Sequence, residues 1–437
     1  MHAQVFWATN DTIGKPLQGI IMLRSIGSVT FLALLMVGCG GGSTGNPNPP
    51  PVADFSLAIS APAVAADVGS QSGPVEVSVR PLNGFSDPVS VEFQGLPSGV
   101  QAQPASFSIT PGGTQSLSFS LGASTPVGTS AIQVVGRSGS LSHSAQLALT
   151  ANSLVRTYTS ADGRLLYLES GNAVDTARIA LYLDWGGTIV EVSANGTNYV
   201  NWHDTGREVQ VSFRSHSDPN WNPTQGGDEH DRGSPVTAEN VTADALYVRT
   251  QPIQWTPDFY NGGSGQTVAG DMLIEQTVTA VRSSPNTFQV HYKFTHLGDD
   301  SHETGPVEFP AVYTNQEYIR FVHYDGQAPW THGDLKISQF PNLEVRPSGA
   351  EVPERWAALV NAQDAGLTVY SPLSGPQWIG FVFPDPGAGS PTDNATNYFA
   401  AIWNWTITPH IVAEGDIYLI AGDYHVARDV VYALHDE

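Results

Sequence analysis

The chain has 437 residues, of which 14% are charged, with 44 glycines, 31 prolines and one cysteine. Its formal net charge of −23 argues against a nucleic-acid partner, because phosphate binding needs clustered Lys and Arg. A single cysteine excludes an internal disulfide framework, so stability must come from core burial. Abundant Gly and Pro with few charges favour a turn-rich, all-β secreted protein.

The N-terminal segment has the features of a bacterial export signal. Residues 22–42 read "MLRSIGSVTFLALLMVGCGGG", in which Arg24 precedes a short apolar stretch that ends before Cys39. The "MVGC" run resembles the lipobox of bacterial lipoproteins, which implies that Cys39 is lipidated. We therefore expect a signal region over 1–39, whose natural start is Met22, and a Gly/Pro-rich tether over 40–51. The expected location is the bacterial cell envelope, with the membrane contacted through the lipid alone.

Residues 52–150 predict a small β-sandwich. Apolar and polar residues alternate in "VEVSV" (75–79), "VSVEF" (89–93) and "LSFSL" (117–121), and Pro/Asn/Gly turns separate the runs. About seven such strands in 100 residues are typical of a sandwich. The segment resembles the immunoglobulin-like modules of bacterial secreted enzymes, which implies a spacer.

Residues 151–437 predict a second, larger antiparallel β domain. At least ten strand-like runs follow one another without alternating helices, and we find no convincing helical periodicity outside the N-terminus. The Asn-Gly pair in "IVEVSANG" predicts a hairpin. In the run 208–213, Val209, Val211 and Phe213 are expected to face the core.

Two groups of motifs carry a resemblance to a known superfamily. The run "GGTI..V..NG...VN..D.GR..Q", followed by "WNP.Q.GD", and the segment "PERWAALVNAQDAGLTVYSP" are similar to galactose-mutarotase-like carbohydrate-active proteins. The resemblance covers about 151–437 and implies a supersandwich of two large antiparallel sheets. It implies a carbohydrate partner, an oligo- or polysaccharide. It implies no particular reaction and assigns no catalytic residue.

The candidate site residues follow from the chemistry of sugars, which offer hydroxyls and apolar ring faces. Polar clusters that contain Trp are the places where such a site is expected. The candidate acids and bases are Asp228, His203, Asp204, Glu308, His323 and Glu354. The candidate binding residues are Arg207, Gln210, Trp221, Asn222, Gln225, Tyr313, Tyr324 and Trp330.

The segment "WNPTQGGD" (221–228) has two interpretations. In the first it lines a cleft, with Trp221 as a stacking platform, Asn222 and Gln225 as hydroxyl-binding groups and Asp228 as the chemical group. In the second it is a structural corner whose Trp caps the core. The residues that follow, 229–232, are expected to be a solvated charge cluster.

Cofactors are not expected from the motifs. The segments "GGDEHDRG" and "GDDSHETG" mix carboxylates with a His, but no HExxH, EF-hand or Cys pair occurs, which leaves a structural calcium ion as an open alternative. The working hypothesis is a lipid-anchored enzyme that acts on a glycan by acid/base chemistry, as a glycoside hydrolase or polysaccharide lyase. A non-catalytic glycan-binding lipoprotein and a structural surface protein are the alternatives.

Overall fold

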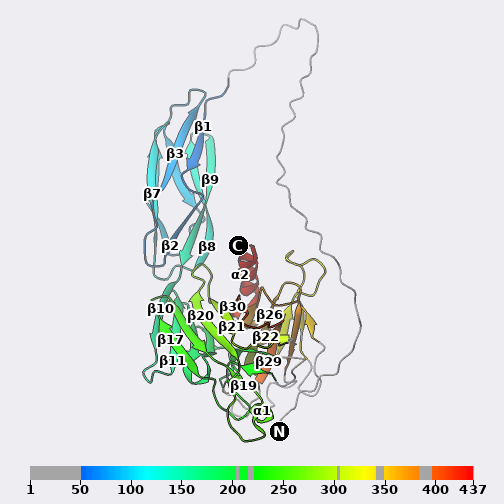
Figure 1. Cartoon of the computed structure of the whole chain (residues 1–437). Coiled ribbons are helices and arrows are strands. Elements are labelled where there is room, and N and C mark those ends of the chain that lie inside the picture. The colour runs from blue at the N-terminus through cyan, green and yellow to red at the C-terminus, as the bar shows by residue number, and fades with distance from the viewer. Residues whose placement is uncertain are drawn as a thin grey trace. The chain divides into compact units, whose positions relative to one another are not determined.

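The structure is a computed structural model that describes residues 51–202, 206–214, 221–302, 306–340, 349–382 and 396–436. These residues form antiparallel sheets almost throughout (Figure 1). The predicted fold class is confirmed: a small immunoglobulin-like sandwich is followed by a large antiparallel supersandwich.

The small sandwich consists of two sheets that enclose their own core. Inward residues alternate along each strand, as in Val75, Val77 and Val79, which pack with Leu117 and Phe119 of the same sheet. One sheet has the order β1 (Asp54–Ile59), β3 (Val75–Leu82), β7 (Thr114–Leu121), β5 (Val100–Gln103). The other has the order β2 (Ala63–Asp67), β9 (Leu141–Asn152), β8 (Gly128–Ser138), β4 (Val89–Gln94), β6 (Phe107–Ile109).

The large sandwich begins with β10, and its first sheet contains twelve strands within the described residues. Its main path is β10 (Leu154–Thr159), β11 (Leu165–Gly171), β12 (Thr176–Tyr182), β13 (Thr188–Ala194), β15 (Val209–Ser212), β22 (Pro306–Asn315), β29 (Thr396–Asn404), β28 (Gln377–Phe381), β25 (Ala350–Glu351). Three short strands attach to this path: β14 (Thr197–Asn198), β16 (Pro223–Thr224) and β19 (Ile253–Gln254). A 3-10 turn, η1 (Leu183–Trp185), joins β12 to β13.

The second sheet has nine strands in the described part of the chain. Their order is β17 (Val236–Val241), β18 (Ala245–Thr250), β20 (Met272–Ala280), β21 (Thr287–His296), β30 (Val412–Asp423), β27 (Ala365–Tyr370), β26 (Trp356–Val360), β23 (Arg320–His323), β24 (Lys336–Ser338). A short helix, α1 (Pro257–Asn261), precedes β20.

One large hydrophobic core joins the two sheets, and it fixes which face of each strand is outward. On β15, Val209 and Val211 lie in this core together with Phe213, as the alternation predicts. From the second sheet, Phe288 and Phe294 of β21 pack into the same core. Each such buried phenylalanine contributes roughly 2–3 kcal/mol to the stability of the sandwich.

The predicted hairpin after β13 is present. Strand β13 pairs with β14 through Ser193–Asn198 and Ala194–Thr197, which leaves Asn195 and Gly196 at the turn. Both turn residues have positive φ, 49° and 82°, as a tight two-residue hairpin requires.

The expectation that helices are missing after the N-terminus is wrong at the C-terminal end. Helix α2 (Tyr424–Asp436) follows β30 directly and packs against β26, β27 and β30 (Figure 1). Ala427, Val430 and Val431 are buried on one side, and Leu434 packs beside them. This is the i, i+3, i+4, i+7 spacing of an amphipathic helix. Within the described residues, no helix has the length and apolar character that a membrane span requires.

Candidate functional site

The outer face of the twelve-stranded sheet, which points away from the shared core, carries a group of aromatic and acidic side chains. Val307, Phe309 and Val312 of β22 lie in the core, so Glu308 and Tyr313 point outward. We call the outward group Glu308, Tyr313, Ile379, Phe381 and Tyr398 the tyrosine patch. Its members come from three neighbouring strands, β22, β29 and β28.

Two tyrosines form the centre of the tyrosine patch. Tyr313 and Tyr398 are paired across β22 and β29, with ring centroids 4.9 Å apart. The Phe381 ring lies 5.3 Å from that of Tyr398 on the other side. Tyr313 and Phe381 are half-buried, whereas Tyr398 is buried. The patch therefore offers partly exposed ring surface above a buried phenol.

The Glu308 carboxylate lies near the Tyr398 phenol, although the two residues are not paired across the strands. Between them lie Ala311 and Ala400, a cross-strand pair whose small side chains leave room for both long side chains. Burial raises the pKa of Tyr398 well above its usual value, and the nearby Glu308 raises it further. Tyr398 therefore stays protonated at neutral pH, and its hydroxyl is able to donate a hydrogen bond.

The chemistry of the tyrosine patch suits a sugar. Glu308 is half-buried, and its carboxylate can exchange a proton or accept a hydroxyl hydrogen bond. Half-buried aromatic rings offer apolar surface to the faces of a pyranose. The positive charge of Arg214 opposes part of the rise in the pKa of Tyr398.

Polar side chains of the described residues 206–214 and 221–228 form hydrogen bonds with the backbone. The Gln210 side-chain oxygen accepts from the Gly226 amide at 2.8 Å. The Gln225 side-chain oxygen accepts from the Val211 amide at 3.1 Å, and its nitrogen donates to Gln276 at 2.7 Å. A Cβ on Gly226 would lie 1.6 Å from the Gly206 carbonyl oxygen, so only glycine fits there. These bonds fasten the segment to β15.

The side chains of Trp221 and Asp228 also contact other residues of the protein. Trp221 is 3% exposed and stacks on His302 at 3.9 Å, so it is not available as an exposed platform. Asp228 is buried and pairs with Arg232 at 2.6 Å, where it also accepts from the His230 amide. This geometry corresponds to the second interpretation of "WNPTQGGD", a structural corner whose Trp caps the core.

Two further candidates in this region differ in their surroundings. Arg207 places its guanidinium 4.9 Å from the centre of the Trp255 ring. Asn222 donates its backbone amide to Gln254, while its side-chain oxygen is buried without a hydrogen-bond partner among the described residues. His203 and Asp204 lie outside the described residues, as does Cys39.

Glu354 and Trp330 lie on the opposite side of the sandwich, beside helix α2. The Glu354 carboxylate is fully buried and accepts from the Trp330 amide, the Trp356 indole and the Tyr432 hydroxyl at 2.6–2.8 Å. Trp330 stacks on His435 at 3.6 Å. These contacts connect α2 to the sheet, so the arrangement is that of a structural anchor.

His323 is the last residue of β23 in the nine-stranded sheet, and Tyr324 follows it directly. His323 is 2% exposed, with its ring 4.8 Å from that of Phe321, and burial lowers its pKa to about 4. The Tyr324 hydroxyl donates to the Ala328 carbonyl and accepts from the Ala328 amide, which closes a local turn. The described candidates thus do not converge on one site: only Glu308 and Tyr313 share the tyrosine patch.

A second aromatic cluster on the outer face was missed by sequence reasoning. Tyr158 and Tyr167 stack at 4.9 Å across β10 and β11. Arg156 lies over Tyr158, and Arg178 lies over Tyr167, at 4.8 and 5.1 Å from the ring centres. We call these four residues the arginine–tyrosine cluster. The alternation in "RLLYLES" contained the signal, since Tyr167 falls between two core leucines.

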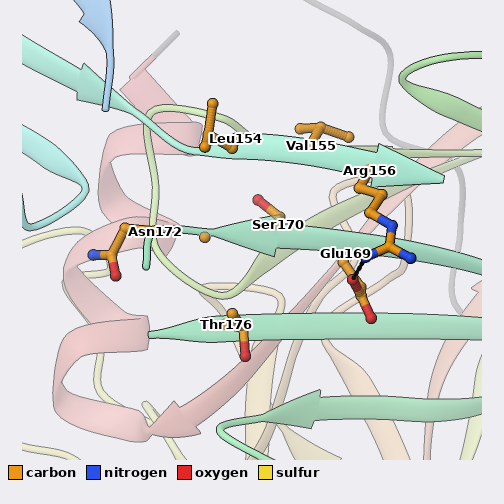
Figure 2. Close-up of a pocket in the computed structure, with 8 residues that line it drawn as sticks. Leu154, Val155, Arg156, Glu169, Ser170, Asn172 and Thr176 are labelled. Carbon is orange, nitrogen blue, oxygen red and sulfur yellow. Dashed lines mark ion pairs between the residues drawn. The ribbon is translucent and has the colours of Figure 1, made fainter. Parts of the chain in front are cut away.

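A pocket opens at the end of β10 to β12, next to the arginine–tyrosine cluster (Figure 2). Its volume of about 140 Å³ is smaller than the 300–1,000 Å³ typical of small-molecule sites. Arg156 and Glu169, 3.9 Å apart, close one side of it (Figure 2). The other lining residues are Leu154, Val155, Ser170, Gly171, Asn172 and Thr176. The pocket is therefore too small to hold an oligosaccharide.

One group of side chains has the donor set of a metal site. The nitrogen and oxygen atoms of Asp271, His296 and His302 lie within 4.8 Å of one another. Burial opposes ionisation of Asp271, but hydrogen bonds from His302, Trp221 and His296 outweigh it and hold its pKa well below the usual range. None of these three was predicted as a ligand, although His302 lies in the "GDDSHETG" segment.

Comparisons with known proteins concern the fold alone. No protein family and no curated protein sequence matches this chain. A candidate aldose 1-epimerase from Klebsiella pneumoniae has 12% identity over 70% of this chain and 87% of its own, with a TM-score of 0.35. A galactose mutarotase-like protein from Clostridium acetobutylicum has 8% identity over 61% and 98%, with a TM-score of 0.33. The E. coli chaperone DraB has 14% identity over 49% and 96%, with a TM-score of 0.19. No residue role is transferred from them.

Proposed function

We propose that the large sandwich binds a carbohydrate chain on the outer face of its twelve-stranded sheet and that Glu308 is the acid/base group there. The observation that carries the proposal is the half-buried Glu308 carboxylate, which lies near the buried Tyr398 phenol on the face that also holds the half-buried Tyr313 ring. Carboxylate, phenol and aromatic surface are the groups that a sugar site combines.

The second aromatic cluster supports a polymeric carbohydrate ligand rather than a monosaccharide. The arginine–tyrosine cluster lies on the same outer face, and β11 and β22 are four strand positions apart in the sheet. At about 4.8 Å per strand, the separation across the sheet is about 19 Å. A ligand that contacts both clusters must therefore span several sugar residues.

Glu308 and Tyr398 have complementary proton roles in this proposal. We infer that Tyr398 orients the Glu308 carboxylate, because the raised pKa of Tyr398 keeps its hydroxyl protonated at neutral pH. Glu308 then accepts a proton from the sugar or from water. This arrangement is compatible with hydrolysis and with elimination. A non-catalytic glycan-binding protein is the alternative, in which the same groups bind without turnover.

The test is a panel of neutral and uronate polysaccharides, assayed for new reducing ends and for the absorbance of unsaturated uronates. Glu308→Gln is expected to lower kcat by about 100-fold or more, and Tyr313→Ala to weaken binding about tenfold. Glu275→Gln is the matched control, because Glu275 also lies beside a tyrosine, Tyr247, from which it accepts a hydrogen bond at 2.8 Å, but on the other sheet.

The outcomes separate the alternatives. Turnover that is lost in Glu308→Gln and kept in Glu275→Gln supports the enzyme. Binding without turnover that is weakened by Tyr313→Ala supports the glycan-binding protein. Full turnover in the Glu308→Gln variant would refute the role given to Glu308.

We also propose that Cys39 carries a lipid that holds the protein on the bacterial cell envelope. The support is the "MVGC" run after an apolar segment and the Gly/Pro-rich tether that follows it. The Cys39→Ser variant is expected to leave the membrane fraction and appear in the soluble fraction. A wild-type protein that is itself in the soluble fraction would contradict the anchor.

A further inference from the structure

We propose that Asp271, His296 and His302 bind a divalent transition-metal ion of the Zn²⁺ class. Asp271 directly precedes β20, His296 ends β21, and His302 lies in the segment after β21. The Asp271 Oδ2 atom lies 3.0 Å from the Nε2 atoms of both histidines. Two ligand atoms about 2.1 Å from a tetrahedral ion are about 3.4 Å apart, so each histidine nitrogen needs to move from Oδ2 by only about 0.4 Å to hold one.

The hydrogen bond of His296 determines which of its nitrogens can bind the ion. Its Nδ1 atom is 2.9 Å from the Thr408 carbonyl oxygen, which can only accept, so Nδ1 carries a proton. Metal binding requires the neutral ring, in which Nε2 has a lone pair that faces the Asp271 carboxylate. The ion then replaces the Nε2 proton, and the hydrogen bond between Nε2 and Oδ2 becomes shared coordination.

Gly298 leaves space beside two of the donor atoms. A Cβ at this position would lie 2.5 Å from Asp271 Oδ2 and 2.8 Å from His296 Nε2. Its backbone is not in the left-handed region, so an alanine is excluded by this contact rather than by φ. The space next to the donors is therefore kept open by the choice of glycine.

The carboxylate is held by a second group, as ligands of protein metal sites commonly are. The Trp221 indole donates to Asp271 Oδ1 at 2.7 Å and leaves Oδ2 for the ion, and its ring stacks on His302 at 3.9 Å. An ion here would join the segment around Trp221 to β20 and β21. It would thereby fasten the corner that begins "WNPTQGGD".

The donor set favours a particular class of ion. Two imidazoles and one carboxylate suit Zn²⁺ and its neighbours, whereas Ca²⁺ prefers oxygen ligands alone. Three protein ligands leave a position for water, and the Asp271 side chain is 33% exposed, which gives solvent a route to it.

The experiment measures metal content and metal affinity of the full chain. After purification and chelator treatment, the wild-type protein is expected to bind one equivalent of Zn²⁺. It should give a Co²⁺ spectrum of low coordination number, change its Trp fluorescence on loading and gain thermal stability. The Gly298→Ala and His302→Ala variants are expected to lose affinity by at least about tenfold.

The matched control is His291→Ala. His291 lies on β21 and forms its own pair with Asp416 at 2.8 Å, and it is not part of the donor group. It should bind Zn²⁺ as the wild type does. Folded wild-type protein that takes up no stoichiometric Zn²⁺ or Co²⁺ overturns the proposal, and so does unchanged affinity in both Gly298→Ala and His302→Ala. In the first case, the two histidines contact the Asp271 carboxylate without an ion.

Discussion

Replacement of Glu354 by Gln distinguishes a structural anchor from a catalytic acid. In the wild type, Oε1 accepts from the Trp330 amide and the Tyr432 hydroxyl, and Oε2 accepts from the Trp356 indole. Glutamine keeps one oxygen, so it can preserve the first two bonds, but it turns an amide nitrogen toward the indole N–H. One charge-assisted bond is lost, two are weakened, and a buried donor is left unsatisfied. The expected cost is about 3 kcal/mol of unfolding free energy.

The assay is urea unfolding of the full chain followed by Trp fluorescence, because Trp330 and Trp356 both contact the substituted group. Glu351→Gln, an exposed glutamate nearby on β25, is the control and should change stability by less than about 0.5 kcal/mol. A Glu354→Gln variant as stable as the wild type would refute the anchor. A folded Glu354→Gln variant that is stable but loses glycan turnover would indicate a catalytic role for Glu354.

Two further predictions concern the fold. His323 has a pKa lowered to about 4 by burial, below the usual 6.5, so the unfolded chain takes up the proton first as the pH falls. Stability should decrease by roughly 3 kcal/mol between pH 6.5 and 4, and His323→Phe should remove that part of the slope in pH-dependent unfolding. Gly226→Ala should cost about 3 kcal/mol or more in thermal unfolding, since its Cβ would lie 1.6 Å from a carbonyl oxygen. Gly73→Ala, with open space around it, should be neutral, and equal stability of the two variants would contradict this packing.

Strand positions and faces could be predicted from the sequence because alternation is local. The apolar residues at 209, 211 and 213 point to the core as their spacing requires, and the Asn195-Gly196 turn adopts the positive φ angles that the pair favours. Helix α2 was missed although its spacing is present. It begins at Tyr424, directly after the long strand β30, so no turn signal separates the two periodicities.

The candidate site could be predicted only in part, because residue type does not reveal the partner that a side chain meets. Glu354 and Asp228 are candidate catalytic acids in the sequence. In the structure, the Trp356 indole donates to Glu354, and Arg232 pairs with Asp228. Trp221 resembles a platform but packs on His302, which is 81 positions later in the sequence and therefore beyond any local pattern. Tyr398 was not predicted because its contact with Glu308 depends on the pairing of β22 with β29.

The most direct test of the central proposal is a crystal structure of the protein with an oligosaccharide from the panel. The proposal predicts sugar rings on the outer face of the twelve-stranded sheet, with one ring against Tyr313 and a hydroxyl or glycosidic oxygen within hydrogen-bond distance of Glu308. A sugar bound beside helix α2, or at the edges of the sandwich without contact to β22 and β29, would contradict it.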